Sequence, residues 1–160
     1  MKPTLEDAIT LATVAHRGQV DKAGAPYILH PLRVMLAVKD SGRSFVPQDI
    51  TEARMVAVLH DVVEDSSLTL DALFELGYPP LVVSAVKYLT RPVGMSYDEY
   101  IERLCKVGPP MAMRVKLLDL EDNLDLSRIA YPTEQDIRRT VKYTDAWHHV
   151  RAGLMSFVGL

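Results

Sequence analysis

Apolar and polar residues along this chain repeat with a helical period rather than a strand period. No segment alternates apolar and polar positions for long, and no Asn-Gly or Asp-Gly hairpin turn occurs, so strand signals are poor. Glycine and proline gather between the apolar-periodic segments, where they indicate loops. The pattern predicts an all-α fold, a compact multi-helix bundle. The expected helices span 4–16, 31–40, 49–64, 69–76, 79–89, 96–106, 110–127 and 133–157.

Four of these helices have start signals in the sequence. The segments "TLED" (4–7), "SYDE" (96–99) and "TEQD" (133–136) place an acid three residues after a Ser or Thr. This spacing is the capping-box pattern or its Asp variant. Thr69 is a candidate N-cap and Gly77 a candidate helix stop.

Length, charge and cysteine content narrow the class of protein. The 160 residues predict one domain, 1–160, because chains of this size bury one sizeable core. The net charge of −3 lacks the basic footprint of a nucleic-acid-binding protein. No apolar run approaches the ~20 residues that span a membrane, and the first residues lack the apolar centre of a signal peptide. The single cysteine, Cys105, fits a reducing compartment, so we expect a cytoplasmic protein without nucleic-acid or membrane partners.

The densest group of acid–base and metal-binding side chains lies in "VAVLHDVVEDSS" (56–67). Each residue of a helix turns the chain by about 100°. With His60 at zero, Glu64 falls at about 40°, Asp61 at about 100° and Asp65 at about 140°. A helix through this segment would therefore carry the four polar groups on one side, beside an apolar stripe. We expect them at the rim of a cleft.

His60 and Asp61 are candidate metal ligands. Imidazole and carboxylate together suit Zn, Mn, Fe or Co better than Ca. Two ligands are too few, and the further candidates are His30 in "HPLRVML" and Asp119 in "VKLLDLEDNL". This set of two imidazoles and two carboxylates leaves positions for water and substrate, as metal-assisted hydrolysis requires. Glu64 or Asp65 would then take a proton from the attacking water.

The segment around Asp119 repeats the same design. Lys116, Asp119 and Asn123 are spaced i, i+3 and i+7 and share one stripe of a helix. An apolar stripe of leucines runs beside it.

Simpler interpretations of the same residues stay open. A His-Asp dipeptide on a helix is usually a surface pair, and His30 can be an ordinary helix-start residue. Glu64 and Asp65 can be a solvated helix end, and the acids of 119–125 a solvent face. The hypothesis of a metal centre therefore depends on these residues occurring together.

In this combination and order, the residues resemble the HD-domain metal-dependent phosphohydrolases. The resemblance is strongest to the RelA/SpoT-type hydrolase domain and the stand-alone small alarmone hydrolases. It covers about residues 4–128, with a C-terminal helix at about 133–157. It implies a compact HD-domain bundle that removes the 3′-pyrophosphate from (p)ppGpp. Its motifs are "AHRGQVDKAGAPYILHP", "LHDVVEDS", "SYDEYIERL" and "VKLLDLEDNL".

The resemblance also implies a role for each matching residue. One divalent metal, Mn²⁺ as first candidate, would be bound by His30, His60, Asp61 and Asp119. Glu64 and Asp65 match the family's Glu-Asp pair, which orients or activates the water. The partner would be a small nucleotide polyphosphate. The residues expected to bind it are Asn123, Lys116, Tyr27 and Lys22.

Two positions depart from the family pattern. Asp21 stands where family members that hydrolyse ppGpp carry an Arg, whose guanidinium stacks on a base and pairs with phosphate. Leu126 stands where a polar residue is common. Two alternatives are therefore kept: an HD nucleotidase or phosphodiesterase for another nucleotide, and a catalytically silent nucleotide-binding module. The Glu64–Asp65 pair argues against the second, because a binding module needs no base.

Overall fold

Four helices begin directly after the Ser or Thr that the sequence marks as a cap. Thr4 and Ser96 each form a reciprocal capping box with the acid three residues on. Thr69 accepts a hydrogen bond from the Ala72 backbone N–H, and the Thr133 hydroxyl accepts one from the Asp136 N–H. Each cap satisfies an amide that has no partner within its own helix. The four predicted helix starts are confirmed.

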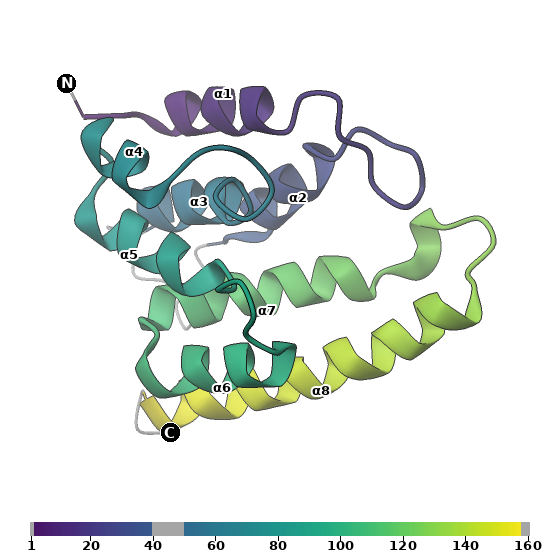
Figure 1. Ribbon diagram of the computed structural model, residues 1–160. Coiled ribbons are helices and arrows are strands. Elements are labelled where there is room, and N and C mark those ends of the chain that lie inside the picture. The colour runs from purple at the N-terminus through teal and green to yellow at the C-terminus, as the bar shows by residue number, and fades with distance from the viewer. Residues whose placement is uncertain (1, 40–49, 158–160) are drawn as a thin grey trace.

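The computed structural model describes residues 2–39 and 50–157, and its regular elements there are all helical (Figure 1). The expectation of an all-α bundle is confirmed. Residues 40–49, which include the loop expected between the helices at 31–40 and 49–64, lie outside the described residues. In chain order the elements are α1 Leu5–Ala15, α2 Leu29–Ala37, α3 Ile50–Leu59, α4 Leu70–Glu75, α5 Pro80–Leu89, α6 Tyr97–Val107, α7 Pro110–Leu124, the 3-10 helix η2 Leu126–Arg128 and α8 Glu134–Phe157.

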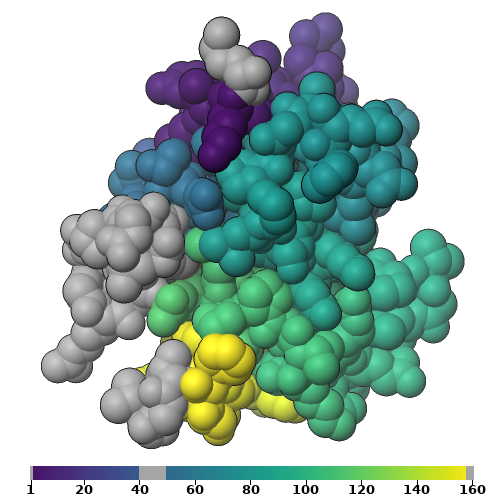
Figure 2. All heavy atoms as spheres, turned by 90° about the vertical axis from the view of Figure 1, so that its left-hand side faces the viewer, coloured from purple at the N-terminus to yellow at the C-terminus, as the bar shows by residue number. Residues whose placement is uncertain are grey.

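Two helices form the centre of the bundle. Helix α3 contacts α1, α2, α5 and α7, and its residues from Met55 to Leu59 are buried on every side. A helix that is apolar all round belongs in a core rather than at a surface. Helix α7 lies between α3 and the outer pair α6 and α8, which also contact each other. Figure 2 shows the C-terminal end of α8, in yellow, beside green segments of the chain.

The α3 segment differs from its prediction. A helix over 49–64 was expected, but α3 ends at Leu59 and the chain continues as turns through Glu64. The Val62 N–H donates to the Leu59 carbonyl, and the His60 side chain bonds to the Ala57 carbonyl at 2.8 Å. These bonds replace the next helical turn. The segment contains no glycine or proline that would have indicated the stop.

Other boundaries shift by a few residues. Helix α2 begins at Leu29, two residues before the predicted start, and ends at Ala37 because Val38 is extended. Helix α7 ends at Leu124, and the predicted continuation to 127 is the separate helix η2. Among the described helices, none is both long and apolar enough to cross a bilayer.

Candidate metal centre and active site

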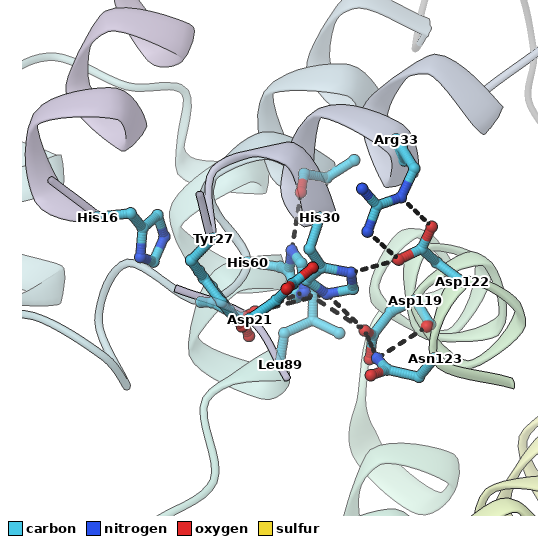
Figure 3. Close-up of polar contacts among 12 residues, drawn as sticks. His16, Asp21, Tyr27, His30, Arg33, His60, Leu89, Asp119, Asp122 and Asn123 are labelled. Carbon is cyan, nitrogen blue, oxygen red and sulfur yellow. Dashed lines mark hydrogen bonds and ion pairs between the residues drawn. The ribbon is translucent and has the colours of Figure 1, made fainter. Parts of the chain in front are cut away.

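The four predicted metal ligands converge from three parts of the chain. His30 comes from the first turn of α2, His60 and Asp61 from the turn after α3, and Asp119 from the middle of α7. His30 Nε2 lies 3.1 Å from Asp119 Oδ1 and 3.7 Å from Asp61 Oδ2. His60 Nε2 lies 3.0 Å from Asp61 Oδ2 and 3.5 Å from Asp119 Oδ1. Figure 3 shows the two imidazoles and Asp119 turned toward one another.

These distances suit a divalent cation. A cation with ligand bonds of about 2.1 Å separates neighbouring ligand atoms by about 3.0 Å in octahedral and about 3.4 Å in tetrahedral geometry. The observed spacings bracket both values. His30, His60 and Asp119 are buried, and His60 Nε2 makes no hydrogen bond of ordinary geometry in the described structure. A buried nitrogen that faces two carboxylates without a hydrogen bond is what a metal ligand requires.

Each ligand is fixed by a partner behind it. His60 Nδ1 bonds to the Ala57 carbonyl, which leaves Nε2 as the atom that faces the centre. The Tyr27 hydroxyl donates to Asp61 Oδ2 at 2.6 Å. Asp119 accepts from Lys116 at 2.7 Å and from the Asn123 amide at 2.7 Å. Such outer contacts orient ligands before any ion binds.

The local charges at the centre favour a bound cation. Burial disfavours the imidazolium, but the carboxylates of Asp61 and Asp119 outweigh it and raise the pKa of His60 well above its usual value. Burial likewise opposes ionisation of Asp119, yet Lys116, His30 and His60 hold its pKa well below the usual value. Against its own burial, the His60 imidazole lowers the pKa of Asp61 to about 2. The carboxylates are therefore ionised and attract positive charge.

The end of α3 at Leu59 changes how the side chains of His60 and Asp61 approach each other. On a helix their side chains would diverge by about 100°, which makes adjacent residues poor partners for one ion. The turn after Leu59 instead brings His60 Nε2 and Asp61 Oδ2 to 3.0 Å. The predicted ligands are thus brought together, but the helical geometry used to predict them was wrong.

Two neighbouring cavities open onto the centre. The first, the metal-centre cavity, has a volume of about 270 Å³ and includes Asp61, Glu64, Asp65 and Asp119 in its walls. The second, the loop cavity, has a volume of about 290 Å³ and lies between the 20–23 loop and the segment 123–129. The residues that line both are Tyr27, His30, Asn123 and Tyr143.

Glu64 and Asp65 lie at the exposed edge of the metal-centre cavity. Glu64 Oε2 accepts a hydrogen bond from the Arg91 backbone N–H at 2.9 Å. Partial burial, together with Asp61 and Glu64, raises the pKa of Asp65. A raised pKa strengthens a carboxylate as a proton acceptor.

Comparison with known proteins gives the same family as the motifs. No family profile matches the chain. A metazoan orthologue of SpoT that hydrolyses ppGpp has a solved structure that superposes with a TM-score of 0.73 and 26% identity, covering 96% of this chain and 88% of that one. The zebrafish (Danio rerio) guanosine-3′,5′-bis(diphosphate) 3′-pyrophosphohydrolase MESH1 is 28% identical over 94% of this chain and 83% of its own length. The chain is thus similar to SpoT-like hydrolases over most of its length.

Two longer relatives match this chain over part of their length. The bifunctional (p)ppGpp synthase/hydrolase SpoT of Escherichia coli is 29% identical over 86% of this chain, and a probable GTP pyrophosphokinase of Mycobacterium leprae is 31% identical over 82%. This chain spans 19% and 17% of those two proteins. The similarity therefore concerns a small part of each of those two proteins.

The substrate-binding residues predicted for this SpoT-like domain fall in three settings. Tyr27 and Asn123 line both cavities while bonding to Asp61 and Asp119. Lys116 is largely buried in the wall of the metal-centre cavity. Burial lowers the pKa of its ammonium, but the Asp119 carboxylate outweighs this effect and raises that pKa well above the usual value. Lys22 is exposed at the loop cavity, 3.5 Å from Asp136. All four border space that a ligand can enter.

Asp21, the departure from the family pattern, organises the loop of the SpoT-like domain in which it lies. Its Oδ1 accepts hydrogen bonds from the backbone N–H groups of Ala23 and Ala25, both at 2.9 Å. Its Oδ2 lies 3.8 Å from Arg128 on η2. Gly24 within this turn has a φ of 79°, a conformation that glycine adopts without strain. Asp21 therefore shapes the wall of the loop cavity.

Asp122, the partner of His30, was not predicted from the sequence. Its Oδ2 lies 2.7 Å from His30 Nδ1, and its two oxygens form a bidentate pair with Arg33 at 2.6 and 3.0 Å. Arg128 also bonds to it, at 3.2 Å. The sequence did contain a signal for this contact. Asp122 lies three residues after Asp119 on the same helix face, and Arg33 lies three residues after His30.

We expect Asp122→Ala to weaken divalent-metal binding by about 10- to 100-fold, the usual effect of losing the partner of a metal-bound histidine. Isothermal titration with Mn²⁺ measures this. Asp125→Ala is the matched control, because its carboxylate accepts from the Ser127 backbone and does not contact His30. Equal metal affinity in wild type and a folded Asp122→Ala variant would contradict the prediction.

Proposed function

We propose that this chain is a metal-dependent (p)ppGpp 3′-pyrophosphohydrolase. One observation carries the proposal: four nitrogen and oxygen atoms of His30, His60, Asp61 and Asp119 converge beside a cavity whose edge holds Glu64 and Asp65. The activity for which the zebrafish relative and the metazoan SpoT orthologue are named supports it. The same proposal takes 1–160 as one domain of a cytoplasmic protein.

The donor set supports a first-row divalent metal, and we propose Mn²⁺. A site with both nitrogen and carboxylate ligands suits Zn, Fe, Co or Mn and is unfavourable for Ca. His30, His60, Asp61 and Asp119 would bind the metal. When bound, such a metal lowers the pKa of water and polarises a phosphoryl oxygen.

The chain's own residues supply the remaining steps. Glu64 and Asp65 lie in the cavity wall, where a carboxylate accepts the proton of the attacking water. Glu64 is fixed there by the Arg91 N–H. Lys116, paired with Asp119, directs positive charge toward the site where negative charge builds on the phosphoryl group.

The loop cavity is where we place the nucleoside. Its walls combine the apolar side chains of Val20, Leu126 and Ile129 with the Tyr27 ring. Apolar and aromatic walls with a few polar groups are typical of sites for planar ligands. Tyr27 and Asn123 line both cavities. A nucleotide whose nucleoside lies in the loop cavity can therefore extend its phosphates to the metal ligands.

Asp21 favours a second candidate function, hydrolysis of another nucleotide by the same centre. A carboxylate that is occupied by the Ala23 and Ala25 N–H groups cannot stack on a base as an Arg would. A nucleotidase or phosphodiesterase with a different base preference fits that loop equally well. A silent binding module fits the Glu64–Asp65 pair less well.

A panel assay separates the three functions. We expect purified protein with Mn²⁺ to release pyrophosphate from ppGpp and pppGpp, and chelation with EDTA to stop the reaction until Mn²⁺ is restored. The panel also contains NADPH, nucleoside monophosphates and cyclic dinucleotides. Turnover of another member alone would select the second function, and binding without turnover of any member would select the third.

A further inference from the structure

The metal-centre cavity has cationic groups as well as acids in its walls. Arg91 follows α5, Lys116 comes from α7 and Lys142 from α8, and all three line this cavity of about 270 Å³. Opposite charges in one cavity usually neutralise each other as ion pairs. Whether each cation has an acid partner therefore decides whether the cavity can bind an anion.

Among the described residues, only one of the three cations has an acid partner. Lys116 lies 2.7 Å from Asp119 Oδ2. In the described parts of the chain, neither Arg91 nor Lys142 forms an ion pair. The Lys142 ammonium lies 3.8 Å from the centre of the Tyr97 ring, and the Arg91 guanidinium bonds to the Met95 carbonyl at 3.4 Å. A ring face and a carbonyl leave the positive charge of both groups available to an anion.

The electrostatics of Lys142 agree with this geometry. Partial burial lowers its pKa first, the nearby Arg91 and Lys116 lower it further, and Asp98 offsets these effects only in part. Arg91 and Lys142 thus repel each other across the mouth of the cavity. A bound anion would relieve that repulsion.

Tyr97 adds a neutral donor to the same wall. Its hydroxyl is buried and has no hydrogen-bond partner among the described residues. Burial raises the pKa of this hydroxyl, so it remains protonated. A buried hydroxyl without a partner, next to an unpaired ammonium, is suited to donate to an oxygen of a ligand.

We propose that Arg91, Tyr97 and Lys142 form a second anion site, which binds the phosphate of a pyrophosphate group that is not under attack. The site would prefer pyrophosphate to a single phosphate, because only pyrophosphate reaches both the metal ligands and these cations. This inference rests on the proposed function, since it names the phosphate group that the same cavity selects.

The test uses the Mn²⁺-loaded chain, with pyrophosphate and orthophosphate as probes in isothermal titration. For Arg91→Ala/Lys142→Ala we expect pyrophosphate to bind about tenfold or more weakly, since each charged hydrogen bond contributes about that factor. Orthophosphate binding should change much less. Arg91→Ala keeps the backbone N–H that holds Glu64. Tyr97→Phe removes only the hydroxyl and should weaken pyrophosphate binding by a smaller factor.

Arg138→Ala is the matched control. Arg138 lies one turn before Lys142 on α8, pairs with Glu134 and is absent from the cavity wall. This variant removes the same charge from the same helix and should bind pyrophosphate as wild type does. Equal pyrophosphate affinity in the double variant and wild type, or no pyrophosphate binding by wild type, would overturn the proposal.

Turnover of ppGpp distinguishes this site from the function on which it rests. If pyrophosphate binding falls in the double variant but wild type does not hydrolyse ppGpp, the anion site stands and the proposed function fails. If ppGpp is hydrolysed and the double variant has the same KM as wild type, the function stands and the anion site fails. With both correct, KM for ppGpp should rise in the double variant more than kcat falls.

Discussion

His60→Ala is expected to reduce hydrolysis of ppGpp by more than about 100-fold, because losing even an outer partner of a metal ligand costs 10- to 100-fold. His60 is one of two imidazoles in the ligand set, and its Nε2 lies 3.0 Å from Asp61 and 3.5 Å from Asp119. Without it, a divalent metal would lose one of its two imidazole ligands. The rate of pyrophosphate release at saturating Mn²⁺ measures the effect.

Burial of His60 makes a folding control necessary. The residue is 2% exposed, so an alanine there leaves a cavity as well as a vacant ligand position. His60→Gln keeps most of the volume and should lose activity to a similar extent. His148→Ala removes an exposed histidine from α8 and should behave as wild type. Hydrolysis by a folded His60→Ala variant at the wild-type rate would show that the assigned centre is not the active site.

The sequence predicted those parts of the fold that depend on local chemistry. Thr4 and Ser96 mark helix starts because a hydroxyl and an acid three residues apart satisfy each other's backbone N–H groups. The end of α3 at Leu59 was not predictable in this way. It depends on the His60 side chain bonding to the Ala57 carbonyl and on burial of Val62, and Val62 is buried in the core that several helices form.

The candidate site likewise has residues that were predictable from the sequence and residues that were not. The ligand types were readable from His30, His60, Asp61 and Asp119, because metal-binding residues are few and chemically distinct. Asp122 was missed because an acid on a helix is normally a solvated residue, and only the fold brings it to His30. The role of Asp21 likewise depends on the turn that its side chain closes. Contacts between distant segments, such as Asp122 with His30, were therefore one part that the sequence alone did not provide.

Glu64→Gln should lower kcat by about 10²- to 10⁴-fold, the usual contribution of a positioned proton acceptor, while metal affinity stays unchanged. The amide keeps the size of the side chain, and its oxygen can still accept from the Arg91 N–H that bonds to Glu64. It cannot take a proton from water at neutral pH. Single-turnover hydrolysis of ppGpp and titration with Mn²⁺ together measure the two effects.

Asp65→Asn and Glu75→Gln complete this comparison. Asp65 lines the same cavity, and its pKa is raised by partial burial, Asp61 and Glu64. Either carboxylate can therefore be the base. Whichever of Glu64→Gln and Asp65→Asn loses more kcat identifies the carboxylate that accepts the proton. Glu75 is exposed on α4, and its replacement should leave kcat unchanged. If Glu64→Gln and Asp65→Asn both retained the wild-type kcat, neither carboxylate would be the base, and the proton would have to leave by another group in the cavity. If Glu64→Gln instead weakened Mn²⁺ binding, Glu64 would belong to the ligand set, and the division between metal ligands and proton acceptor would have to be redrawn.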